Sequence, residues 1–123
     1  MSTDTERLRV GTRASRLALW QTNHVIARLE ASWPGLRVER VPITTLGDRM
    51  TTVALSRIGD KGLFTRELED GLRSGEIDMA VHSLKDLPTE LSDGVAISAV
   101  LQREDARDVL ISRDGRASCR ERV

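Results

Sequence analysis

The sequence predicts an α/β domain with a central mixed, mainly parallel sheet and flanking helices. Segments that alternate apolar and polar residues, as strands do, are separated by segments whose apolar residues recur every three or four positions, as in helices. A short apolar run over 79–81 stands between a helix-like segment and a polar turn, which is typical of a buried strand. Strand, helix and strand in this order imply a right-handed parallel crossover.

The composition is that of a soluble globular protein. The chain has 123 residues, enough for one ordinary domain or for one domain and the start of another. No apolar run approaches the length of a bilayer span and nothing marks the amino terminus for secretion, so we expect a cytoplasmic protein with no membrane partner. Nineteen basic residues balance nineteen acidic ones and aromatic residues are scarce, so we expect no nucleic-acid partner.

Three residue types with reactive side chains are rare. The single cysteine, Cys119, cannot form an internal disulfide, and with His24 and His82 it offers too few ligands for a usual Cys/His metal site. No metal is therefore expected. Among the 19 basic residues only Lys61 and Lys85 are lysines. An ammonium differs from a guanidinium in reach and hydrogen bonding, so these two lysines are candidate site residues.

The first predicted elements are a strand over 8–10 and a helix that follows the tight turn at 11–13. Ser15 can cap this helix, which is worth about 1 kcal/mol, although Ala18 cannot complete a reciprocal capping box. The helix ends at Trp33-Pro34-Gly35. Its apolar-compatible face comprises Ala18, Thr22, Val25 and Leu29.

A second strand is predicted from Leu36 to Ile43, before a long segment of weak periodicity over 44–62. A short apolar patch at 53–55 suits one helical turn. Loops this long are usually functional or mobile in a compact domain. The segment ends in Gly59-Asp60-Lys61-Gly62, where glycines allow a close backbone approach to a ligand and Lys61 supplies a cation. A flexible hinge is the alternative interpretation.

A second amphipathic helix is predicted from Phe64, Leu68 and Leu72, which stand four residues apart, and it ends at Gly75. We expect Phe64 to anchor the core and not to serve as a ligand platform. Further strands are predicted over 95–101 and from Val109 to Ile111, with a charged connector between them.

Chemically active side chains crowd the turn after the strand at 79–81. They are His82, Ser83, Lys85 and Asp86, and Pro88 closes the turn. Sheets of this class bind ligands beyond the carboxyl ends of their strands. An ammonium beside a carboxylate at this place could therefore act on a bound ligand. The alternative is a solvated Lys-Asp turn.

The turn at 12–15 should lie at the same edge of the sheet as 83–86, because both follow parallel strands. Arg13 and Ser15 at a helix amino terminus form an anion site through free N–H groups, the helix dipole and a guanidinium. Lys61 is expected nearby. These residues predict a small ligand that carries carboxylate or phosphate groups.

Five stretches resemble the porphobilinogen deaminase family, also called hydroxymethylbilane synthase, in its order and spacing. The resemblance runs from Leu8 to about Gly115. Four stretches are similar to the family's amino-terminal motifs and the fifth to its interdomain connector: Gly11–Gln21, Gly47–Asp48, Gly59–Leu68, Asp78–Pro88 and Arg103–Asp108.

The resemblance implies a transferase of haem biosynthesis. Such enzymes join four porphobilinogen molecules into hydroxymethylbilane and release ammonia at each step. The resemblance also implies a dipyrromethane cofactor, bound by a thioether to a cysteine of a third domain that this chain lacks. The first two domains would be similar to type II periplasmic binding proteins, with the active cleft between them, and the full-length protein would be a monomer.

The same resemblance divides the chain. Residues 1–101 would form the first domain with half of the cleft, 102–108 the interdomain connector, and 109–123 the truncated start of the second domain. The tail after Gly115 does not resemble the family, and Cys119 is not equated with the cofactor cysteine. We therefore expect an amino-terminal fragment that is inactive by itself.

Site roles also follow from the resemblance. Asp86 is similar to the catalytic carboxylate, which stabilises an azafulvenium cation as ammonia leaves and can move protons. A non-catalytic module that binds small anions on the same fold, or a nonfunctional fragment, is the alternative. The residues similar to ligands of cofactor and substrate acid groups are Arg13, Ser15, Ser83 and Lys85, with Lys61 on the mobile loop over the cleft.

Overall fold

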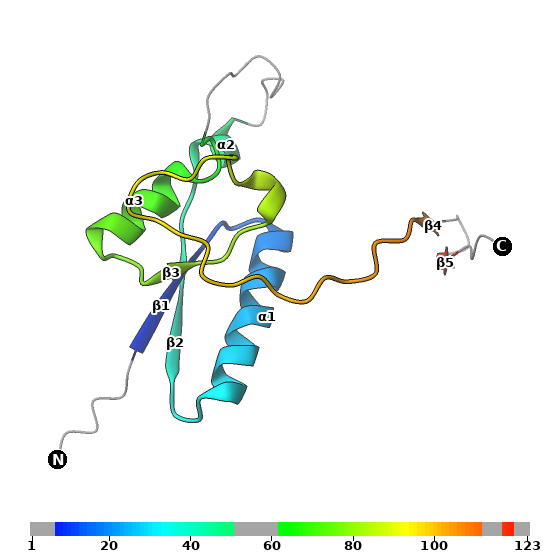
Figure 1. Ribbon diagram of the computed structural model, residues 1–123, viewed down its shortest axis with the longest axis horizontal. Coiled ribbons are helices and arrows are strands. Elements are labelled where there is room, and N and C mark those ends of the chain that lie inside the picture. The colour runs from blue at the N-terminus through cyan, green and yellow to red at the C-terminus, as the bar shows by residue number, and fades with distance from the viewer. Residues whose placement is uncertain (1–6, 51–61, 112–116, 120–123) are drawn as a thin grey trace.

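The computed structural model describes residues 7–50, 62–111 and 117–119. Its centre is a three-stranded sheet with the order β2-β1-β3, in which both pairings are parallel. The central strand is β1 (Arg7–Thr12), with β2 (Arg37–Pro42) on one side and the short β3 (Met79–Ala80) on the other. The predicted α/β architecture with a parallel sheet and flanking helices is confirmed (Figure 1).

The first helix, α1 (Arg16–Ser32), begins where it was predicted to begin. The Ser15 hydroxyl accepts a hydrogen bond from the backbone N–H of Ala18 at 3.3 Å, so the serine cap is confirmed. On the predicted face Thr22 is buried, and its hydroxyl oxygen lies 2.7 Å from that of Thr12 at the end of β1. This contact helps to fix the start of α1 against the carboxyl end of β1.

The short helix α2 (Leu46–Arg49) was not predicted. Its cap is reciprocal: the Thr45 hydroxyl accepts from the backbone N–H of Asp48 at 3.3 Å, and the Asp48 carboxylate accepts from the backbone N–H of Thr45 at 3.2 Å. A capping box of this kind can stabilise a helix of a single turn. The helical turn predicted at 53–55 lies outside the described residues.

The helix α3 (Arg66–Ser74) confirms the second predicted helix and ends at Gly75, whose φ of 74° is in the left-handed region. In Figure 1, α1 and α3 lie on opposite sides of the strands. Crossovers that run in opposite directions along a parallel sheet place their helices in this way. The buried apolar residues are Val10, Leu68 and Ile77, and of these Leu68 and Ile77 pack against Gly11 of β1 on the α3 side of the sheet.

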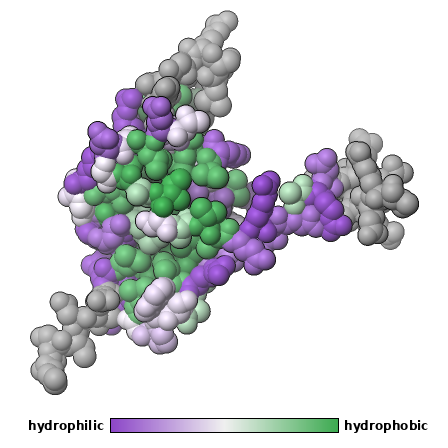
Figure 2. All heavy atoms as spheres, in the orientation of Figure 1, coloured by the Kyte–Doolittle hydropathy of each residue, from purple (hydrophilic) through white to green (hydrophobic). Residues whose placement is uncertain are grey.

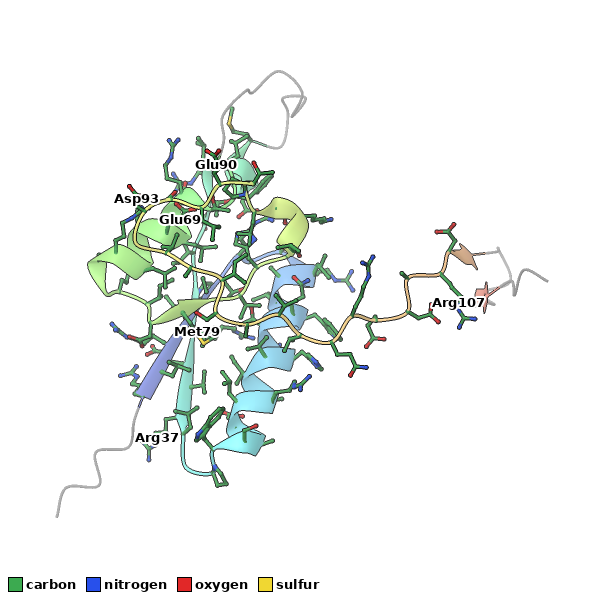
Figure 3. The ribbon with its side chains drawn as sticks, viewed as in Figure 1. Arg37, Glu69, Met79, Glu90, Asp93 and Arg107 are labelled. Atoms are coloured by element: carbon green, nitrogen blue, oxygen red, sulfur yellow. The ribbon has the colours of Figure 1, made fainter. Side chains whose placement is uncertain are left out.

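The segment after β3 begins with one turn of 3₁₀ helix, η2 (Leu84–Asp86), and then crosses α3. Ser92 donates a hydrogen bond to the Glu69 carboxylate at 2.5 Å, and the Arg73 guanidinium donates to the Asp93 carbonyl at 3.2 Å. Figure 3 shows Glu69 and Asp93 close together at α3. These contacts hold the chain as far as the Asp93 turn.

The strand predicted over 95–101 is wrong. These residues have no regular secondary structure, and the side chain of Val100 is 75% exposed. A strand needs a neighbouring strand for its ladder hydrogen bonds, and no neighbour for this segment is found among the described residues. The extended chain instead leads away from the sheet to β4 (Val109–Ile111), which confirms the last predicted strand and pairs antiparallel with β5 (Ala117–Cys119) (Figure 1).

In the part of the chain that the structure covers, no helix combines the length and the apolar character that crossing a bilayer requires.

Candidate functional site

The turns that follow β1 and β3 meet at the carboxyl edge of the sheet. The backbone N–H of Val81 donates to the Gly11 carbonyl at 3.1 Å, which aligns the two strand ends. Beyond this point the Arg13 guanidinium lies 3.3 Å from the Asp86 carboxylate (Nη1 to Oδ2). The prediction that 12–15 and 83–86 share one edge of the sheet is therefore confirmed.

Arg13 is the central cation of this edge. Its Nη2 donates to Asp48 Oδ1 at 2.6 Å and its Nε donates to the same oxygen at 3.1 Å. Its guanidinium carbon also stands 4.2 Å from the centre of the Phe64 ring, within cation–π range. Arg13 thus contacts two carboxylates and an aromatic ring, and its side chain is only 16% exposed.

The Asp48 carboxylate is also held by hydrogen bonds from Thr45. It accepts from the Thr45 hydroxyl at 2.8 Å, in addition to the backbone N–H of Thr45. Burial raises the pKa of Asp48, but the hydrogen bonds from Arg13 and Thr45 outweigh it and hold the pKa below its ordinary value. The Asp48 carboxylate is therefore ionised at neutral pH.

Phe64 lies before α3 and not on it. It is half-buried, and its ring packs so closely against Gly47 that a Cβ at that position would come within 2.3 Å of a ring carbon. His82 Nε2 lies 2.9 Å from the Phe64 carbonyl oxygen. Because a carbonyl only accepts hydrogen bonds, this ring nitrogen carries the proton. Phe64, expected as a core anchor, thus also supports Arg13.

A solvent-open pocket of about 290 Å³ adjoins this cluster. Lys85 is exposed and Asp86 is partly exposed at its wall. Lys85 and Asp86 therefore line the same pocket, and Arg13 contacts the Asp86 carboxylate. The lining residues are Gly62, Leu63, Phe64, Lys85, Asp86, Leu87 and Pro88.

The other predicted site residues have different surroundings. The Ser83 hydroxyl donates to the Gln21 side-chain oxygen at 2.9 Å, which ties the residue before η2 to α1. Ser15 is exposed and engaged as the helix cap. Lys61 lies outside the described residues, so the predictions about it stay predictions. Within the described ranges, no group of three or more His, Cys, Asp or Glu side chains is arranged to hold a metal ion.

The sequence analysis assigned no site role to Thr45, Asp48 or Gln21, although Asp48 and Gln21 stand in two of the stretches that resemble the family. The spacing of threonine and aspartate three residues apart at 45 and 48 is a capping-box signal, and it could have predicted α2. The pairing of Arg13 with Asp48 spans 35 positions, and no local pattern indicates it.

Comparisons with known proteins agree on one family. The family model described as "Porphobilinogen deaminase, dipyromethane cofactor binding domain" matches residues 8–122, so the match extends beyond Gly115, where the resemblance was expected to end. Porphobilinogen deaminase of Syntrophomonas wolfei is 63% identical over 105 residues, which are 85% of this chain and 34% of that relative. Porphobilinogen deaminase of Pelotomaculum thermopropionicum is 58% identical over 87% of this chain, and that of Moorella thermoacetica is 55% identical over 88%. The match covers 34% of each of these two relatives. The chain thus spans about a third of the length of these curated relatives.

Proposed function

The chain belongs to the porphobilinogen deaminase family, and on this premise we propose that it provides the catalytic carboxylate and part of the anion site of a hydroxymethylbilane synthase. The proposed reaction joins four porphobilinogen molecules into a linear tetrapyrrole and releases one ammonia for each molecule added. The observation that carries the proposal is the Asp86 carboxylate, partly exposed at the pocket wall beside Lys85 and in contact with Arg13.

Asp86 is the proposed catalytic residue. Loss of ammonia from the aminomethyl group of porphobilinogen leaves a cation that is delocalised onto the pyrrole nitrogen. A fixed carboxylate that accepts a hydrogen bond from that N–H stabilises the charge as it develops. The same carboxylate can take up and return the proton that is exchanged during each condensation.

The cations have a different proposed role, which is to hold acid groups. Porphobilinogen carries an acetate and a propionate, so a growing chain is a polyanion that needs several positive partners. Lys85 is exposed at the pocket, and Arg13 has more N–H groups than its contacts with Asp48 and Asp86 use. Ser15, Ser83 and Lys61 complete the proposed set of ligands on the strength of the family resemblance.

The donor set also fits the cofactor in the family's description. A dipyrromethane carries carboxylates, which Arg13 and Lys85 would bind. It also carries pyrrole N–H groups, from which the Asp86 carboxylate would accept hydrogen bonds. When bound, this group supplies the end to which the first substrate is joined. Its covalent anchor is proposed to be a cysteine in a third domain outside this chain, and Cys119 is not that residue.

We propose the domain plan that the resemblance implies. Residues 1–101 belong to a first domain similar to type II periplasmic binding proteins, 102–108 to an interdomain connector and 109–123 to a second domain. The exposure of every residue from Ala96 to Asp108 supports a connector in this region. The whole protein is proposed to act as a cytoplasmic monomer.

A chimera tests the function. The chain replaces the matched segment of the Syntrophomonas wolfei relative, and hydroxymethylbilane formation is measured for the chimera and for the chain alone. We expect product from the chimera and none from the chain alone, because the chain alone provides only part of the proposed cleft. In the chimera, Asp86→Asn keeps the shape of the side chain and removes its charge.

Turnover by the Asp86→Asn chimera should fall on the order of 10² to 10⁴ with a much smaller change in KM. If turnover instead stays within about threefold of the parent, on a scale where catalytic groups contribute 10² or more, the carboxylate is not catalytic. The pocket would then be better described as a non-catalytic anion-binding module.

A further inference from the structure

Arg13 meets its two carboxylates through different parts of the guanidinium. Asp48 takes the edge formed by Nε and Nη2, with contacts of 3.1 and 2.6 Å. Asp86 meets Nη1 alone, at 3.3 Å. The Nε and Nη2 groups both donate to Oδ1 of Asp48, and Nε also lies 3.3 Å from its Oδ2, so Asp48 holds the stronger position and Asp86, with a single contact, the weaker one.

The surroundings of the guanidinium oppose its rotation. The Phe64 ring covers one face of it at 4.2 Å, and Phe64 is itself tied to His82 through its backbone carbonyl. Asp48 is anchored by the hydroxyl and the backbone N–H of Thr45 at the cap of α2. The edge that Arg13 turns toward Asp86 is therefore determined by its contacts with Asp48 and Phe64.

We infer that Asp48 is a positioning residue for Asp86: it keeps Arg13 from forming a two-point pair with Asp86 and so leaves a carboxylate oxygen of Asp86 available to the substrate. Without Asp48 the Nε and Nη2 edge would be open to Asp86, the next carboxylate in contact with the same guanidinium. A two-point pair would engage both oxygens of Asp86. The inference rests on the proposed function only in taking Asp86 as the group that contacts the substrate.

The geometric part is tested on the chain itself, with no activity measurement. Hydrogen exchange of the Arg13 Nε–H group is followed by NMR in the parent, in Asp48→Asn, in Asp86→Asn and in the double variant. In the parent background, Asp86→Asn should change the exchange rate by less than about twofold, because Asp48 holds that N–H. In the Asp48→Asn background, Asp86→Asn should speed exchange by about tenfold, the size expected when a charged hydrogen bond is lost.

The coupling between the two substitutions decides the result. Equal effects of Asp86→Asn in both backgrounds would overturn the inference, as would a large effect in the parent. Asp70→Asn is the matched control, because Asp70 is an exposed aspartate that pairs with Arg73 on α3. It should leave the Arg13 signal unchanged in every background.

The functional part uses the chimera. Asp48→Asn should lower kcat by about tenfold with KM changed less, since displacement of a catalytic group can cost up to about 10² in rate. Asp48→Glu keeps the charge and should recover part of the loss, whereas Asp70→Asn should stay within about twofold. If Asp48→Asn does not fold, Thr45→Val is the alternative variant. It removes the hydrogen bond from the Thr45 hydroxyl to Asp48, leaves both carboxylates in place and should also lower kcat.

The outcomes separate this inference from the proposed function. If Asp86→Asn leaves turnover unchanged while the exchange experiment shows the coupling, the proposed function fails and the positioning geometry stands. If Asp86→Asn abolishes turnover while Asp48→Asn and Thr45→Val leave kcat within about twofold, the inference fails and the proposed function stands.

Discussion

At the scale of single residues, the site depends on how a few charges are shared. Arg13 divides its N–H groups between Asp48 and Asp86, and Lys85 is the exposed cation of the pocket. An ammonium and a guanidinium are not equivalent there, because one is a compact point charge and the other a planar fork. Substitutions that keep the charge and change its shape therefore test these roles best.

Lys85→Arg in the chimera should raise KM by about fivefold while kcat changes less, because the proposed partner of Lys85 is an acid group and not the reacting carbon. Steady-state kinetics with porphobilinogen measures both quantities. The reciprocal change Arg28→Lys, at an exposed position of α1, should alter neither. A loss confined to kcat would contradict the anion-holding role.

A second residue-scale prediction concerns acid stability. Arg9 donates side-chain hydrogen bonds to the Asp78 carboxylate at 2.7 and 3.1 Å, and its backbone N–H donates a third; these bonds lower the pKa of Asp78. A carboxyl whose folded pKa lies below its unfolded value stabilises the fold above the unfolded pKa, about 3.9 for aspartate. That stability is lost as the pH falls from there through the folded pKa.

Urea unfolding between neutral pH and pH values below the aspartate range checks this. The free energy of unfolding should fall less steeply with acid in Asp78→Asn than in the parent, because the variant has no carboxylate to protonate at this position. The same measurement on Asp93→Asn, an exposed turn position, serves as the control. Identical acid limbs for the parent and Asp78→Asn would refute the prediction.

At the scale of elements, the packing of α3 on β1 requires a very close approach. A Cβ added at Gly11 would lie 2.3 Å from Ile77 Cδ1 and 3.1 Å from Leu68 Cδ2. All three residues are buried, so the neighbours have little space into which to move. The absence of a side chain at residue 11 therefore allows β1, α3 and the segment before β3 to share one small core.

Gly11→Ala should lower the free energy of unfolding by about 1–3 kcal/mol, the usual cost of overpacking a core. Ile77→Val removes the methyl group that the new Cβ would meet, at its own cost of about 0.5–1.5 kcal/mol. The double variant should therefore be more stable than the sum of the two single changes predicts. Chemical denaturation of the four proteins measures this coupling, and strict additivity would count against the close contact.

At the scale of the whole molecule, order and burial are unevenly distributed. The described core is small and lies between the sheet and its helices, whereas residues 96–108 are exposed throughout. In Figure 2 the visible face of the body has a broad apolar area, and the extended segment beside it is largely hydrophilic. Figure 3 labels Arg107 in that segment, where its contacts are with Asp105, two residues away.

Hydrogen exchange of the whole chain should reproduce this distribution. Backbone amides of β1, α1 and α3 should exchange slowly, because their hydrogen bonds open only with the packed core. Amides from residue 96 to residue 108 should exchange within about tenfold of unstructured peptide rates, since they have neither ladder nor helix hydrogen bonds. Uniform protection from Leu8 to Ile111 would contradict the structure.

The sequence by itself determined α1, α3, the three parallel strands and the sheet edge at which their turns meet. Strand alternation, helical spacing, the Ser15 cap and the stop at Gly75 act over a few residues, so local patterns predict α1, α3 and the three parallel strands. The order of those elements then placed the turn at 12–15 beside the turn at 83–86. Motif spacing also indicated the family, which the comparisons confirm.

Only the tertiary structure decided which charges meet. Arg13 contacts Asp48 and Asp86, which are 35 and 73 positions away in the sequence. Contacts between residues so far apart in the sequence depend on how the elements pack. The same reason explains the error at 95–101, because an apolar alternation becomes a strand only where a neighbouring strand supplies hydrogen bonds. Local patterns report the preference of a segment, whereas pairing and ion contacts depend on the partner that packing brings to it.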